Sequence, residues 1–521
     1  MNHWLTAAPI LVPLTTAALC MLAWNYPVVQ RVLSLAGSVT LVVLAGILAA
    51  TTLNDGIQVV QMGAWAAPFG ITLVADPLSA LMIVIASIMG LCCAVYALGD
   101  IDPVRERGGF HPIFQVLMVG VCGAFITGDL FNLYVWFEVM LISSFVLLSL
   151  GGTKVQIDAA VKYVAINLVA TACLLLAVAL LYGITGTLNM ADLSQRLPQV
   201  ANQGLVSAIA VLFIIAFGMK AALFPFFFWL PAAYHTPAVA VQAIFAGLLT
   251  KVGVYSLLRV FTLIFIGDTG WTHSILLWMA GITMIVGALG SLAARDLTRA
   301  WSWQVVAHIG SMVMGLAIAT PLALAATAFY LVHDIVVKTN LFLSAGLVRR
   351  LSGGEDTAFA RLGGLFKAAP WLCVLLFIPL ASLAGFPPLS GFWGKLLLVK
   401  AGLETQHYAM VAALLVSGLL TIWLVGRVWA EMVWKAPVQP PAALLASMAR
   451  GRAYALMLPL VLLSLITFGI GVNPDRLLSV AAQVGASLHD TSAYVEAVLG
   501  GKAEPVPTLV GELQHQAGDR P

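Results

Sequence analysis

Charged side chains occur deep inside apolar stretches of this sequence, where a charge is energetically expensive. They are Glu138, Lys220, Lys251, Lys338 and Lys395. In a bilayer, one charge at the centre costs about 2.5–3.5 kcal/mol on an insertion scale. Five such groups, here called the charged row, therefore indicate either a use for the charges or mutual pairing.

Further polar groups accompany the charged row. Asp334 precedes Lys338 by four residues, so the two share a helix face in the favourable acid-first order. His308 and His333 lie in neighbouring apolar stretches, and either a hydrogen-bonded core histidine or a proton-relay group would explain them. Three other groups are predicted to have positional roles: Asp76 as a helix cap, Asp129 as a cap or orienting group, and His235 as an interfacial residue.

A row of lysines favours proton chemistry over cation binding. A charged lysine has no acceptor and repels Na⁺, so these residues do not form a sodium or metal site. A desolvated lysine releases its proton readily, and a nearby carboxylate opposes that release. The row therefore predicts a proton path along the membrane plane, fed by half-channels. The competing interpretation is a buried Glu138–Lys220 ion pair that only fixes helix packing, but four lysines outnumber the acids such pairing requires.

Composition sets the class of protein. Of the 521 residues, 61% are apolar and 9% charged, whereas a soluble domain carries about 25% charge. A mean hydropathy of +1.01 excludes soluble enzymes, nucleic-acid binders and disordered chains. The net charge of +3 includes no long basic run. All six cysteines lie in apolar runs and are interpreted as small hydrophobes. No NAD, flavin, haem or iron–sulfur motif occurs, so no cofactor is expected.

Apolar runs predict an all-α polytopic membrane protein with about 14 transmembrane helices, each spanning about 20 residues. The predicted spans are 4–23, 30–51, 76–98, 111–127, 130–150, 158–183, 204–235, 238–264, 271–294, 298–319, 321–348, 369–401, 406–434 and 453–472.

Loop charges predict the orientation. Basic residues such as Arg105, Arg295 and Arg349 concentrate in loops after odd-numbered spans, whereas loops after even-numbered spans hold essentially only Arg196. Positive loops stay in the cytoplasm. We therefore expect both termini on the extracytoplasmic side of a bacterial inner membrane. Residues from Asn473 onward are predicted to be an external tail with one short helix.

Two spans are predicted to be broken helices. The seventh contains Pro225 and Pro231, and the twelfth contains Pro387 and Pro388 between glycines. Non-helical backbone at membrane depth is tolerated only where protein buries it or it lines a wet cavity. Breaks five spans apart predict two inverted five-helix repeats. The predicted parts are helices 1–3 in 1–104, the first repeat in 105–265, the second in 266–435, and the last helix with the tail in 436–521.

Ordered motifs surround these residues over roughly residues 105–400. They are Thr127-Gly-Asp-Leu-Phe-Asn-Leu-Tyr-Val-Trp-Phe-Glu138, Gly218-Met-Lys-Ala-Ala-Leu-Phe-Pro225, His235-Thr-Pro237, Lys251-Val-Gly253, His308-Ile-Gly310, His333 to Lys338, and Gly385-Phe-Pro387 to Lys395. In this combination the chain resembles the antiporter-like subunits shared by respiratory complex I and the multisubunit Mrp-type cation/proton antiporters. Lys395, where one complex I subunit carries glutamate, is more similar to the Mrp branch.

The resemblance implies a role for each matching residue. Glu138 and Lys220 would be the family's essential pair, and Lys251 its central connecting lysine. Lys395 would exchange protons with one side of the membrane. The groups that would relay protons between the two halves are His308, His333 and Lys338.

Three functions remain open from the sequence. The leading hypothesis is a transporter subunit, not an enzyme, that carries protons inward while Na⁺ or another monovalent cation leaves elsewhere in a hetero-oligomeric complex. Its partners would be other hydrophobic subunits, these ions and the lipid bilayer, with no nucleic acid. The alternative is a proton-pumping membrane subunit of a complex I-type NADH:quinone oxidoreductase or membrane hydrogenase. The third is a structural scaffold within either complex.

Overall fold

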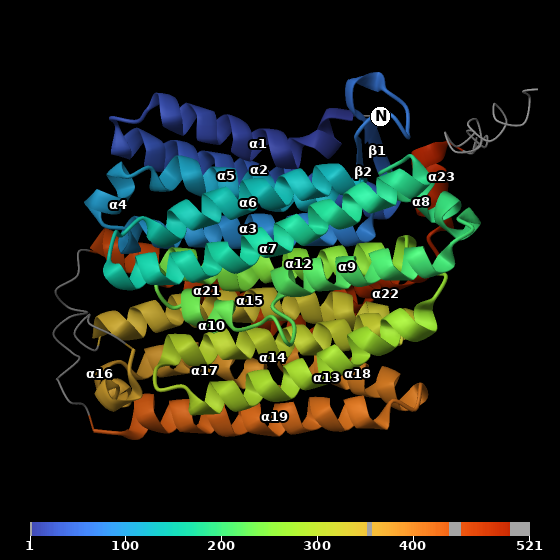
Figure 1. Ribbon diagram of the computed structural model, residues 1–521. Helices are drawn as coiled ribbons and strands as arrows, with labels where there is room; N and C mark the ends of the chain where they lie inside the picture. The colour runs from blue at the N-terminus through green and yellow to red at the C-terminus, as the bar shows by residue number, and fades with distance from the viewer. Residues whose placement is uncertain (1–2, 352–356, 437–449, 501–521) are drawn as a thin grey trace, which may run out of the picture.

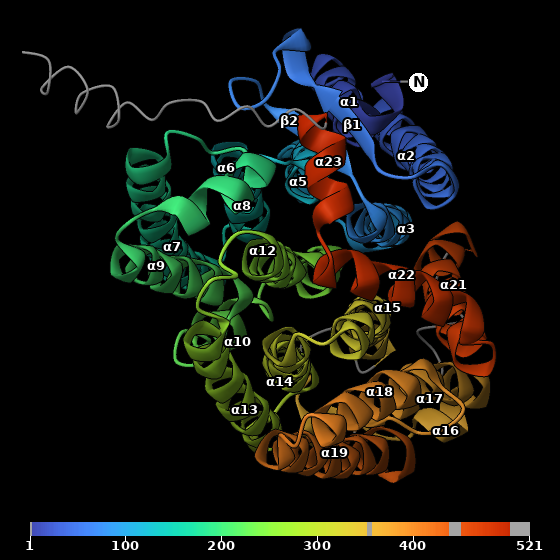
Figure 2. The ribbon, with the colours of Figure 1, turned by 90° about the vertical axis from the view of Figure 1, so that its right-hand side faces the viewer.

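The computed structural model describes residues 3–351, 357–436 and 450–500. Its long helices run side by side and roughly parallel (Figure 1). Seen along their axes, α12 (Thr250–Leu263), α14 (Leu297–Ile318) and α15 (Pro321–Leu351) occupy the middle, and the other helices surround them (Figure 2). The most hydrophobic stretch of Val239–Leu263 is 100% buried and those of α14 and α15 are 89% buried, against 39% in Lys154–Thr185. Charged groups on the middle helices are therefore shielded from lipid.

Twelve described helices are long and apolar enough to cross a membrane, which confirms the polytopic all-α class. Two shorter apolar helices, α5 (Phe110–Ile126) and α17 (Pro370–Ala384), fall on the predicted fourth and twelfth spans. The total of 14 crossings and the inverted repeats stay predictions. The remaining helices on predicted spans are α1 (His3–Leu22), α2 (Pro27–Asp55), α3 (Pro77–Asp100), α6 (Leu130–Ser149), α7 (Lys154–Thr185), α9 (Gln203–Ala221), α10 (Trp229–Ala233), α11 (Val239–Ile244), α13 (Thr269–Ala293), α18 (Ser390–Glu404), α19 (Tyr408–Trp429) and α21 (Arg450–Val472).

Both predicted breaks are present, with different shapes. After α9 the chain turns at Ala222, whose φ is +62°, and only the five-residue α10 follows. After α17 it turns at Gly385, with φ +90°, and the 15-residue α18 follows. A third irregularity was not predicted: a π-helix, η3 (Phe245–Leu249), joins α11 to α12. π-Helices shift backbone hydrogen bonds by one residue and occur often at functional sites.

The C-terminal prediction was wrong in part. Residues after Asn473 form two helices, α22 (Asp475–His489) and α23 (Ser492–Leu499), instead of one short helix in a tail. Buried Ala481, Val484 and Leu488 recur at helical spacing, so α22 has an apolar face that packs on α15. Residues 501–521 lie outside the described part of the chain. A hairpin of β1 (Gln58–Gln61) and β2 (Thr72–Ala75), paired antiparallel, is a further element that the sequence did not predict.

Acidic residues at both ends of α3 tie it to the middle helices. Asp76 caps α3, as predicted, by accepting from the Ser79 N–H at 2.9 Å. Both of its oxygens also accept from Arg259 of α12, at 2.7 and 2.8 Å. At the other end, Asp100 accepts from Arg350 of α15 at 2.7 Å. These bonds fix α3 lengthwise against the helices that carry the charged row.

Asp76→Asn is expected to destabilise the protein by about 3–5 kcal/mol, because it leaves the guanidinium of Arg259 buried without a counter-charge. The measurement is thermal unfolding of the purified protein in detergent. Asp158→Asn is the matched control, since its ion pair with Lys162 is exposed on α7 and contributes little. Equal losses of melting temperature in the two variants would contradict this prediction.

Candidate proton-transfer site

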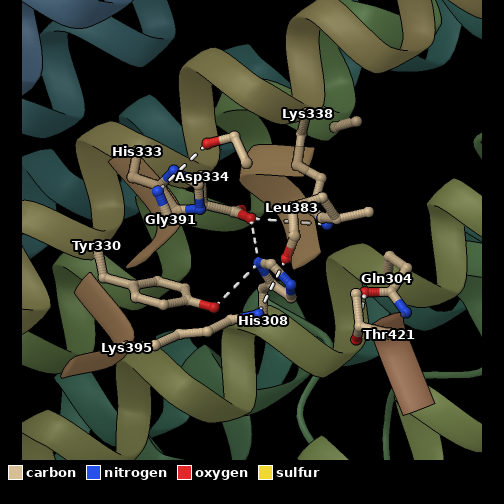
Figure 3. A network of polar contacts seen from close by, with 12 residues as sticks. Gln304, His308, Tyr330, His333, Asp334, Lys338, Leu383, Gly391, Lys395 and Thr421 are labelled. Carbon is tan, nitrogen blue, oxygen red and sulfur yellow. Dashed lines mark hydrogen bonds and ion pairs between the residues drawn. The ribbon is translucent and has the colours of Figure 1, made fainter. Parts of the chain in front are cut away.

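The carboxylate of Asp334 is the centre of the site (Figure 3). Its Oδ2 lies 2.7 Å from Nζ of Lys251, and its Oδ1 lies 2.8 Å from Nδ1 of His308. Nζ of Lys338, one turn along α15, lies 3.7 Å from Oδ1. All four residues are buried, with exposures of 0–2%. Three middle helices thus meet at one carboxylate, which the sequence predicted only to share a helix face with Lys338.

The charge balance of this cluster suits an exchangeable proton. Two ammonium groups face one carboxylate, and Nζ of Lys338 makes no hydrogen bond with the described residues. A buried charge is costly unless it is paired and hydrogen-bonded. One carboxylate cannot compensate both lysines fully. The cluster can therefore give up or accept a proton with less penalty than an isolated ion pair would incur.

Helical spacing on α15 places the accompanying groups. Tyr330, His333 and Asp334 lie on one face because they are three and four residues apart. The Tyr330 hydroxyl lies 3.1 Å from Nδ1 of His308. Nδ1 of His333 lies 2.9 Å from the hydroxyl oxygen of Ser390, the first residue of α18. The two histidines therefore connect in different directions, one to the carboxylate and one to the second break.

The second break holds the Lys395 side chain. Its Nζ donates to the carbonyls of Leu383 at 2.9 Å and Ala384 at 3.1 Å, the last residues of α17. The final carbonyls of a helix have no partner within that helix and carry partial negative charge. The hydroxyls of Ser382 and Ser390 bridge the same break at 3.0 Å. Half-buried Lys395 is thus stabilised by backbone oxygens without a carboxylate.

In the first half of the chain, a hydroxyl lies between the predicted glutamate–lysine pair. Thr171 of α7 donates to Oε1 of Glu138 at 2.7 Å and accepts from Nζ of Lys220 at 2.9 Å. The Lys220 ammonium also lies 5.2 Å from the ring centre of Phe137. Lys220 is 6% exposed and Glu138 is half-buried. The structure therefore brings these two residues together through a third helix.

Helix α12 connects the two halves. Lys251 and Gly253 are two residues apart, so they lie on nearly opposite faces. Lys251 faces Asp334, whereas a Cβ on Gly253 would lie 2.7 Å from the Ala221 nitrogen and 3.0 Å from the Lys220 carbonyl carbon. Nζ of Lys251 also donates to the carbonyl of Ala246, within the π-helix, at 2.7 Å. The backbone of Lys220 and the side chain of Lys251 thus flank the same helix.

A small cavity lies between Lys220 and the start of α12. Its volume is about 20 Å³, enough for about one water molecule. It is lined by Phe137, Met140, Leu141, Tyr163, Asn167, Lys220, Trp229, Tyr234 and Leu249.

His235 lies on a larger polar cavity. The volume of this cavity is about 330 Å³, and three arginines line it beside His235: Arg295, Arg299 and Arg349. Nδ1 of His235 lies 3.1 Å from the Pro231 carbonyl oxygen. His235 therefore lies apart from the Asp334 cluster, at a place where polar groups gather near helix ends.

Sequence reasoning missed several groups that the structure places in the site. Asp334 is the carboxylate within the predicted eleventh span, and that position alone could have indicated a centre. Tyr330, Thr171 and Ser390 gave no signal, because hydroxyl residues are common in these helices. Their partners lie on other helices, 22 to 57 residues away in the chain.

Comparison with known proteins identifies the class. A family model described as "NADH:quinone oxidoreductase/Mrp antiporter, TM" matches residues 127–421. The D subunit of the Na⁺/H⁺ antiporter of Alkalihalophilus pseudofirmus is 42% identical over 96% of this chain and 100% of the relative. The D subunit of the Bacillus subtilis Na⁺/H⁺ antiporter is 38% identical over 94% of this chain and 98% of the relative. A chain in the structure of the Mrp complex from Dietzia sp. superimposes with a TM-score of 0.86 and 29% identity, covering 96% of this chain and 100% of that one.

The chain belongs to the NADH:quinone oxidoreductase/Mrp antiporter family of membrane subunits. Within it, the relatives that match over nearly the full length are the D subunits of Na⁺/H⁺ antiporters, which confirms the resemblance to the Mrp branch.

Gly253→Ala is expected to separate α12 from α9, because the new methyl group would overlap the backbone of Ala221. Overpacking of this kind costs about 1–3 kcal/mol, and the melting temperature of the purified protein measures the loss. Gly183→Ala is the control, since no atom lies within 4 Å of a Cβ at that position in α7. A Gly253→Ala variant as stable as Gly183→Ala would show that the close approach is unimportant.

Proposed function

We propose that this chain is the proton-translocating subunit of a multisubunit Na⁺/H⁺ antiporter, and that it is a transporter rather than an enzyme. The observation that carries the proposal is the set of buried titratable side chains that extends through the family-matched region from Glu138 to Lys395. Relatives that match over nearly the whole chain are named as antiporter subunits, which favours this function over a redox-driven pump.

The proposed proton path has a first half, a centre and a second half. In the first half, Glu138 and Lys220 exchange protons, and the cavity beside Lys220 leads toward α12. In the centre, Lys251, Asp334 and His308 hold the proton between the halves. In the second half, the members of the path are Lys338, His333 and Lys395.

Electrostatics would couple neighbouring steps along this path. At an effective dielectric constant of about 20, two unit charges about 4 Å apart interact by about 4 kcal/mol. A proton that leaves Lys251 therefore changes the balance at Asp334, and so the ease with which Lys338 binds a proton. Because charged lysines do not bind cations, Na⁺ would cross elsewhere in the complex. Its partners there would be other hydrophobic subunits, as in the Mrp complex that its structural neighbour belongs to.

The distribution of basic residues supports the proposed orientation in the bacterial cell membrane. Figure 1 places α4 (Pro103–Arg107) and α16 (Leu365–Ala368), which carry Arg105 and Lys367, at one end of the molecule. The β-hairpin and α23 lie at the other end. The first end would face the cytoplasm. The polar cavity beside His235 contains Arg295 and Arg349, so it would be a cytoplasmic entrance to the path.

Lys220→Ala and Glu138→Gln are expected to lower antiport by about 100-fold or more, because a positioned group that transfers the proton is lost. The measurement is Na⁺-dependent proton movement in everted vesicles from an antiporter-deficient strain that expresses the whole complex. Lys162→Ala, an exposed lysine on α7, is the control and should keep wild-type activity. Wild-type antiport in the Lys220→Ala complex would refute the proposed path.

Ser492→Cys in α23 is expected to react with a membrane-impermeant maleimide in intact cells, whereas Lys154→Cys at the start of α7 should react only after lysis. Both positions are exposed and lie at the predicted outer and inner ends. The six native cysteines are buried or half-buried, so the unmodified chain provides the background. The reverse labelling pattern would invert the proposed topology.

A further inference from the structure

We infer that Thr171 is a relay residue in the first half of the proton path, where its hydroxyl transfers the proton between Lys220 and Glu138. The inference rests on the proposed function. Three helices contribute to it: α6 with Glu138, α7 with Thr171 and α9 with Lys220. The hydroxyl oxygen lies 2.7 Å from the carboxylate and 2.9 Å from the ammonium, and none of the described ion pairs joins Glu138 directly to Lys220.

The direction of the two hydrogen bonds suits proton transfer. A hydroxyl has one proton to donate and lone pairs to accept with, and Thr171 uses both functions here. When the Lys220 ammonium gives a proton to the Thr171 oxygen, the hydroxyl passes its own proton to Oε1 of Glu138. The products are a neutral amine, an unchanged hydroxyl and a carboxylic acid. One proton has moved from lysine to glutamate, and no other reactant is needed.

The partner of the Thr171 hydroxyl is unusual for this protein. A threonine inside a helix commonly donates to the carbonyl four residues earlier. Buried threonines elsewhere in the chain do so, with distances of 2.5–2.9 Å; they are Thr283, Thr327 and Thr467. Thr171 instead directs its proton across to α6. Its hydroxyl therefore serves the contact between Glu138 and Lys220 rather than its own helix.

The surroundings hold this hydroxyl in place. Thr171 is 7% exposed, and a β-branched side chain in a helix has few accessible rotamers. Phe137 covers the ammonium of Lys220 from another side, at 5.2 Å. The cavity beside Lys220 holds about one water molecule and is not lined by Thr171. The hydroxyl is thus the group in contact with both Glu138 and Lys220, while the cavity serves the next step of the path.

The test compares Thr171→Val with Thr171→Ser in the whole antiporter complex, with rates divided by the amount of assembled complex. Valine keeps the branched shape without a hydroxyl, and we expect about tenfold slower antiport together with a shifted pH profile. Serine restores the hydroxyl and should restore both. Thr467→Val removes a buried hydroxyl that bonds its own helix, so it controls for general effects of that loss.

The possible results separate the inference from the function beneath it. If Lys220→Ala abolishes antiport but Thr171→Val keeps the wild-type rate and pH profile, the relay is overturned and the proposed function stands. If Lys220→Ala keeps antiport, both are overturned. Should Thr171→Val assemble poorly, Thr171→Ala provides the same comparison with a smaller side chain. Failure of both to assemble, beside normal assembly of Thr171→Ser, would assign the hydroxyl a structural role and overturn the relay.

Discussion

One buried carboxylate has to compensate two lysines and to bond a histidine, and the architecture of the middle helices depends on this constraint. Asp334 contacts Lys251 and His308 directly and lies one helical turn from Lys338. These charges can exist there only if the helices that carry them keep the contacts within hydrogen-bond reach. The surrounding ring of apolar helices excludes water and strengthens each interaction, but it also makes any lost contact costly.

Helix irregularities provide the oxygen atoms that the scarce acids do not. Lys251 donates to Ala246 in the π-helix, and Lys395 donates to two carbonyls where α17 ends. Lys220 lies in the last turn of α9, just before the first break. Each of these lysines is therefore near backbone that departs from the regular helix. The breaks have an electrostatic use: they expose carbonyl dipoles that stabilise a charge without binding it as tightly as a carboxylate would.

The sequence predicted the parts of this arrangement that depend on local properties. Charged residues in apolar runs identified Glu138 and the four lysines, and prolines located the two breaks. Contacts between helices depend on how the bundle packs, so neither the pairing of Asp334 with Lys251 nor the position of Thr171 could be derived from spacing. The π-helix has no sequence signature. The apolar face of α22 could have been recognised from its spacing, whereas the short β-hairpin has too few residues to produce a pattern.

The two acidic ends of α3 have a consequence for motion. Asp76 holds Arg259 of α12, and Asp100 holds Arg350 of α15, with 24 residues of helix between them. At about 1.5 Å per residue, these anchors are about 36 Å apart, near opposite surfaces of the membrane. Sliding α12 along α15 would break one anchor or the other. The core therefore behaves as a clamped frame in which protons, side chains and water move while the main helices keep their axial positions, and α3, which provides the clamp, lies outside the stretch that the family model matches.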